Sequence, residues 1–147
     1  MENSNSSNQL SKEQIESVML LYSSGEIHEA ISRIKSLNES YPNVPLLFNI
    51  LGACYKSIGE IDGAIQMFDT ATKIKPNYAE AYFNIGVIYY EISQLNQAVN
   101  FYLKAIEANP GYSDVHNNLG IAYLDLRQLD KAIKHLELAI SFRPEFP

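Results

Sequence analysis

Residues 79–112 read AEAYFNIGVIYYEISQLNQAVNFYLKAIEANPGY, and this stretch of sequence decides the fold. Its proline, Pro110, belongs to a series with Pro42, Pro76 and Pro144 in which successive members are 34 residues apart. Such a period is typical of proteins that stack one small structural repeat several times. We expect a disordered leader at residues 1–10, followed by a domain at 11–146 with four repeats: 11–44, 45–78, 79–112 and 113–146.

Each repeat contains two runs of apolar residues at helical spacing, such as Leu47 and Leu51 in the first run of the second repeat. A turn at Gly59 separates the two runs, and the proline that ends the repeat cannot continue a helix. The pattern therefore predicts an all-α chain of four helix–turn–helix repeats, with a helix A and a helix B in each. Glycine inside a helix costs about 1 kcal/mol relative to alanine. We expect Gly52 of helix A to face Ala64 of helix B, where two small residues permit close approach.

The positions that recur with this period resemble the tetratricopeptide repeat (TPR) family. The resemblance covers most of the chain and implies a right-handed superhelical solenoid with a concave groove lined by the A helices. The first repeat departs from the pattern, with Gln14, Ser17 and Val18 at the aromatic, leucine and glycine positions, as a terminal repeat often does. The recurring residues are an aromatic slot (Phe48, Tyr82, His116), an aliphatic residue before glycine (Leu51–Gly52, Ile85–Gly86, Leu119–Gly120), a tyrosine (Tyr55, Tyr89, Tyr123) and two alanines (Ala64 and Ala71, Ala98 and Ala105, Ala132 and Ala139).

The resemblance implies that a ligand lies along the groove of A helices. Asn84 and Asn118 occupy equivalent places in adjacent repeats, and an amide both donates and accepts hydrogen bonds to the backbone of an extended peptide. This pair is similar to the asparagine ladder in the TPR region of O-linked N-acetylglucosamine transferase. Asparagines on exposed helices are also often only solvated, and the sequence does not decide between the two interpretations. The candidate peptide-binding residues are Asn49, Phe83, Asn84, Tyr90, Asn117 and Asn118.

Charge points to the kind of partner that such a groove would bind. The chain has 11 Lys and Arg against 17 Asp and Glu, a net charge of -6, which disfavours nucleic acid and anionic membrane surfaces. No arrangement of the repeats supplies the basic residues with which co-chaperones of this family hold acidic chaperone tails. A protein or peptide partner with basic residues is expected, because the A helices of the third and fourth repeats have no Lys or Arg but carry Glu80, Glu91, Asp114 and Asp125.

Groups that could carry catalysis or hold a cofactor are missing from the sequence pattern. No nucleophile–base arrangement, phosphate-binding loop or acidic metal cluster is present, and no two of the three histidines have the i, i+4 spacing of a helical zinc motif. Cys54, the single cysteine, is expected to be a buried small side chain. We therefore expect no enzyme activity, no cofactor and no metal. With neither a signal peptide nor an 18-residue apolar segment, a cytoplasmic location is expected.

These observations favour a protein-interaction scaffold that binds an extended partner segment in the groove. An alternative is the non-catalytic N-terminal TPR region of a larger enzyme, such as a glycosyltransferase or a sulfotransferase. Pro147 stands three periods after Pro45, where another helix A would begin, so we expect the natural chain to continue. A third possibility is a homo-oligomer formed through the last repeat, because no sequence remains here for a helix over its helix B, whose apolar face is Ile133, Leu136 and Ile140.

Overall fold

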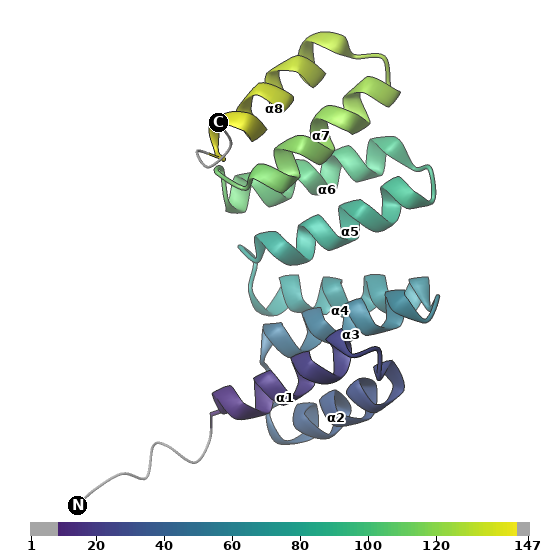
Figure 1. The fold of residues 1–147 in the computed structure, drawn as a ribbon, viewed down its shortest axis with the longest axis vertical. Coiled ribbons are helices and arrows are strands. Elements are labelled where there is room, and N and C mark those ends of the chain that lie inside the picture. The colour runs from purple at the N-terminus through teal and green to yellow at the C-terminus, as the bar shows by residue number, and fades with distance from the viewer. Residues whose placement is uncertain (1–8, 144–147) are drawn as a thin grey trace, which may run out of the picture. The chain divides into compact units, whose positions relative to one another are not determined.

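The computed structural model describes residues 9–143, which form eight α-helices and no β-strand (Figure 1). Each 34-residue repeat holds one pair of helices, and the all-α repeat fold predicted from the sequence is confirmed. Most of the predicted leader, together with Pro144 and Pro147, lies outside the described residues. The helices are α1 (Lys12–Ser23), α2 (Ile27–Ser40), α3 (Pro45–Ser57), α4 (Ile61–Ile74), α5 (Ala79–Glu91), α6 (Leu95–Ala108), α7 (Ser113–Asp125) and α8 (Leu129–Ser141).

The chain divides into two compact units, here called the N-terminal half (residues 1–74) and the C-terminal half (residues 75–147). In the N-terminal half, each of α1 to α4 packs against the next helix along the chain. Its core contains Val18, Ile34 and Cys54, none of which is exposed. Burial raises the pKa of the Cys54 thiol to about 11, so the predicted buried, unreactive cysteine is confirmed.

The departure of the first repeat from the TPR pattern has a local cause at the start of α1. The Ser11 side chain accepts a hydrogen bond from the Gln14 backbone N–H (3.2 Å), and the Gln14 side-chain oxygen accepts one from the Ser11 N–H (2.9 Å). This capping box satisfies two backbone donors that the first turn of a helix leaves unpaired. Gln14 therefore begins a helix at the position where other repeats place an aromatic packing residue.

In the C-terminal half, α5 to α8 likewise pack in sequence order, each against the next (Figure 1). The core between the third and fourth repeats is formed where α6 meets α7. Small and large side chains alternate there, which lets the two helices interlock at close range. The buried residues at this contact are Ala98, Val99, Tyr102 and Ala105 from α6, and Val115, Leu119 and Ala122 from α7.

The helix A glycines allow close approach, but to a different residue than the sequence suggested. A Cβ built on Gly52 would lie 2.7 Å from the ring of Phe68, not against Ala64. The equivalent atom on Gly86 would lie 2.6 Å from the ring of Tyr102. The expected Gly52–Ala64 contact is therefore wrong: the glycine makes room for the large side chain one helical turn further along helix B.

A left-handed residue closes the turn within every repeat. Gly25 and Gly59 have φ values of +82° and +81°, and the equivalent Ser93 and Arg127 have φ values of 63° and 60°. Each turn ends with the same long backbone hydrogen bond, for example from the Gln94 N–H to the Tyr89 carbonyl (2.8 Å). Glycine adopts this conformation readily, whereas other L-residues do so at a cost of roughly 1–2 kcal/mol. Two repeats thus use the residue that suits the turn and two do not.

Candidate peptide-binding surface

Polar side chains from α5, α6 and α7 meet on one side of the C-terminal half. The Tyr90 hydroxyl on α5 donates a hydrogen bond to Oδ2 of Asp125 on α7, at 2.5 Å. This bond, together with burial, raises the pKa of Tyr90 above its usual value, so the hydroxyl keeps its proton at neutral pH. The bond links the A helices of adjacent repeats and fixes the orientation of an exposed carboxylate.

A second bond joins α7 to α6 on the same surface. The Asn118 amide donates to the hydroxyl oxygen of Tyr102 at 3.4 Å. The Tyr102 ring is buried, and this burial raises its pKa to about 12, against the opposing effect of the Asn118 bond. The hydroxyl is therefore protonated and can donate in turn. Because an amide has two N–H groups and one carbonyl oxygen, Asn118 retains bonding capacity beyond Tyr102.

These side chains surround a small pocket of about 70 Å³, lined by Tyr90, Tyr102, Asn118 and Ile121. Such a volume holds one or two water molecules or the tip of a side chain, and is far below that of a pocket for a small-molecule ligand. Two tyrosine hydroxyls and an amide supply directional polar contacts, and Ile121 supplies an apolar wall. The arrangement suits a surface that is touched by a passing chain rather than a cavity that encloses a substrate.

The acidic residues predicted for this surface are not equivalent. Asp114 is paired with the guanidinium of Arg143, which follows α8, so one of the four expected negative charges is balanced. Glu80, Glu91 and Asp125 are exposed on the A helices. A net negative character remains at this surface, and it favours approach of a positively charged segment at low salt.

The remaining predicted residues occupy different environments. Asn84 lies half-buried on α5, at the place that corresponds to Asn118. Phe83 packs between aromatic rings, with its centroid 6.0 Å from that of Tyr102 and 5.4 Å from that of Tyr112. Its ring therefore helps to join the third and fourth repeats.

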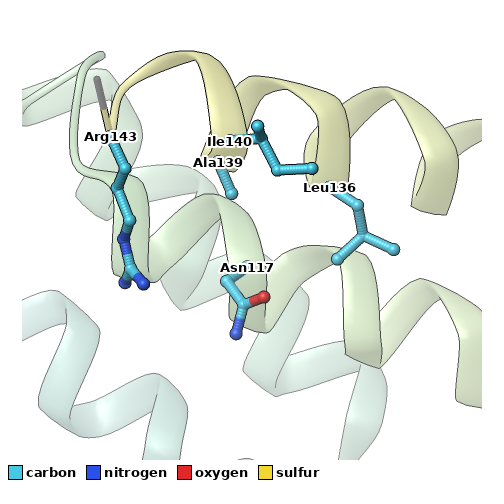
Figure 2. Close-up of a pocket in the computed structure, with 5 residues that line it drawn as sticks. All are labelled: Asn117, Leu136, Ala139, Ile140 and Arg143. Carbon is cyan, nitrogen blue, oxygen red and sulfur yellow. The ribbon is translucent and has the colours of Figure 1, made fainter. Parts of the chain in front are cut away.

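Two of the candidate asparagines are not part of this surface as the structure describes it. Asn49 is 4% exposed and lies on α3, in the N-terminal half. Asn117 lies on α7 but lines a separate, larger pocket beside α8 (Figure 2). The structure therefore brings together Tyr90 and Asn118, along with Tyr102 and Asp125, which the sequence analysis did not select as binding residues.

A histidine pair in the fourth repeat was also missed. Nδ1 of His116 lies 3.1 Å from Nδ1 of His135, and Nε2 of His116 lies 2.8 Å from the Pro110 carbonyl oxygen. Because a carbonyl only accepts, Nε2 of His116 carries a hydrogen and its Nδ1 accepts from His135. The pair could have been found from the period, since Tyr82 and Phe101 stand 34 residues before these histidines. Spacing along one helix, which governs zinc motifs, does not detect contacts between helices A and B.

The described residues give no sign of a metal site or a membrane span. Among residues 9–143, no group of three or more His, Cys, Asp or Glu side chains could hold a metal ion. Within the same range, no helix has the length and apolar character needed to cross a bilayer.

Comparison with known families decides the kind of repeat. A family model described as TPR repeat matches residues 52–93, and two described as tetratricopeptide repeat match residues 79–112 and 101–134. The chain belongs to the tetratricopeptide repeat family. Together the three matches span more than half of this TPR chain and include all the residues of the Tyr90–Asn118–Asp125 surface. A search of curated proteins found no match.

Solved structures with the same TPR architecture include several of MamA. A crystal structure of MamA superposes with a TM-score of 0.80 at 24% identity, covering 88% of this chain and 76% of that chain. MamA 41-end from Desulfovibrio magneticus RS-1 gives a TM-score of 0.76 at 25% identity, covering 91% of this chain and 76% of that chain. MamA MSR-1 C2 gives 0.68 at 16% identity, covering 85% and 72%. These likenesses show a shared helical-repeat fold.

Proposed function

We infer that this TPR protein is a protein-interaction scaffold whose C-terminal half binds an extended partner segment along the surface shared by α5 and α7. The observation that carries this proposal is the meeting of Tyr90, Tyr102, Asn118 and Asp125 around one small pocket. The polar groups lie on helices, which hold side chains more rigidly than loops do. Hydroxyl and amide groups pair with a peptide backbone whatever its side chains, so they suit recognition of an extended chain.

The direct test uses the partner, identified by affinity purification, and calorimetric titration of its binding segment. The variant Asn84→Ala/Asn118→Ala removes both equivalent amides, and we expect it to weaken binding at least tenfold. The matched control is Asn96→Ala/Asn100→Ala, which removes two exposed asparagines from α6. Equal affinity of wild type and the α5/α7 variant, with helicity preserved in both, would contradict the assignment of the site.

The negative charge on this surface supports a partner with Lys or Arg near the pocket. Asp125→Asn keeps an oxygen that can accept the Tyr90 hydroxyl but removes the charge. We expect this variant to slow association and to reduce the dependence of affinity on salt, because screening acts on charged groups. An association rate that is independent of salt in the wild type would contradict a basic partner while leaving the site itself intact.

A further inference from the structure

The outer face of α8 is exposed at the positions where α6 is buried. Val99 of α6 is 8% exposed, whereas Ile133, one period later on α8, is 53% exposed. Tyr102 is 1% exposed, and its counterpart Leu136 is only half-buried. Ile140 reaches 72%. The apolar stripe that α7 covers on α6 is therefore repeated on α8 with no described helix over it.

This stripe borders an open pocket of about 470 Å³, here called the end pocket (Figure 2). Figure 2 shows Leu136, Ala139 and Ile140 on α8 and Asn117 on the neighbouring helix α7, with Arg143 at one edge. The volume lies in the range of pockets that accept several side chains. The Arg143 guanidinium is already paired with Asp114, so the apolar lining, rather than charge, defines this pocket.

The internal contact between α6 and α7 shows what kind of element fits such a face. Val115, Leu119 and Ala122 of α7, at positions i, i+4 and i+7, are each fully buried at this contact. On the receiving side, α6 offers the small residues Ala98 and Ala105, and α8 repeats them as Ala132 and Ala139. The same backbone approach is therefore possible on α8, which is the geometric requirement for a second helix of this type.

The end pocket differs from the internal contact at its centre. In the third repeat the space between helices is filled by Phe83 and Tyr102, whose ring centroids are 6.0 Å apart. In the fourth repeat these positions hold Asn117 and Leu136, which have smaller side chains. A helix seated on α8 would consequently find more room opposite its middle residue than α7 finds opposite Leu119.

We propose that the end pocket binds an amphipathic helix of a partner protein with apolar residues at i, i+4 and i+7, the middle one being aromatic. This surface is separate from the α5/α7 surface, and the proposal does not depend on it. A second copy of this chain in head-to-tail contact fits less well. Its α1 presents Glu13, Ser17 and Leu20 where α7 presents Val115, Leu119 and Ala122, so charged and polar groups would face the pocket.

The test uses two fluorescein-labelled peptides with the sequence of residues 111–127, one unchanged and one with Leu119→Phe. Anisotropy titration with the whole chain is expected to show saturable binding of both, with the Phe peptide at least threefold tighter. Ile140→Glu should weaken binding of both peptides at least tenfold. Leu20→Glu on α1 is the matched control, because it places the same charge on a leucine that is 69% exposed, and should leave binding unchanged.

Three outcomes would overturn the proposal. Neither peptide binds; or both bind equally well to the Ile140→Glu chain, which places them elsewhere; or sedimentation shows a dimer that Ile140→Glu abolishes, which would make a second copy the occupant. Far-UV circular dichroism checks that the variant folds, and Ile140→Gln, which adds no charge, repeats the test with a smaller change. With Ile140→Gln we expect at least a threefold loss of affinity.

Discussion

The third and fourth repeats carry nearly the same pattern of residues, yet their B helices have different surroundings. In α6, Tyr102 is enclosed between its own repeat and α7. In α8, Leu136 stands at the same position beside an open pocket. The comparison shows that a TPR motif specifies which face of a helix is apolar, whereas the neighbouring element decides whether that face is core or surface.

The sharpest way to break this comparison is to crowd both helix contacts with one methyl group. Gly86→Ala would press on the enclosed Tyr102 ring, and we expect a loss of about 2–3 kcal/mol in the free energy of unfolding. Gly120→Ala presses on Leu136, which has free space beside it, and on the Ala132 carbonyl at 3.3 Å. We expect it to cost less than about 1 kcal/mol, because alanine also favours the helix by a similar amount. Urea unfolding followed by circular dichroism measures both, and equal losses would contradict the account.

A smaller effect is expected at the turns, which differ between repeats independently of packing. Ser93→Gly and Arg127→Gly should each raise the free energy of unfolding by about 0.5–1 kcal/mol, because the strain of a positive φ outweighs the added flexibility of the unfolded chain. Gly59→Ala should lower it by about 1 kcal/mol, although its Cβ would meet open space. A stabilising Gly59→Ala variant would show that backbone conformation is not what the turn selects.

The smallest effect expected is a dependence of stability on pH that arises from the fourth repeat alone. Burial, followed by the neighbouring His116 and Lys134, lowers the pKa of His135 below its usual 6.5. The unfolded chain then binds a proton more readily than the folded one, so stability is complete above pH 6.5 and falls as pH drops through the lowered pKa. Urea midpoints measured between pH 7.5 and 5 should show this decline.

The control for the histidine pair is the third repeat itself. His116→Tyr/His135→Phe installs the residues that Tyr82 and Phe101 provide there, and neither titrates near neutral pH. The double variant should lose most of the decline between pH 6.5 and 5. If the decline persists unchanged, carboxylates elsewhere in the chain control it.

Prediction from sequence succeeded where a residue's role depends on its own repeat. The prolines, the helix periodicity and the buried Cys54 are all local, and they led to the all-α repeat fold. The Gly52–Ala64 contact was wrong because the pattern does not indicate how far a large side chain such as Phe68 reaches across helix A. Tyr102 and Asp125 were missed as site residues because their bonds to Asn118 and Tyr90 link different repeats, and separations of 16 and 35 residues are invisible to helical spacing.

The most direct test of the central claim is to map where the partner segment binds. Backbone amide shifts of the labelled chain should change on addition of the segment, most strongly at Tyr90, Asn118 and Asp125, with α6 and α8 amides on the far side unaffected. Such a result would place the segment on the α5/α7 surface. Changes confined to α8 and the end pocket, with Tyr90 and Asn118 unmoved at saturation, would contradict the account.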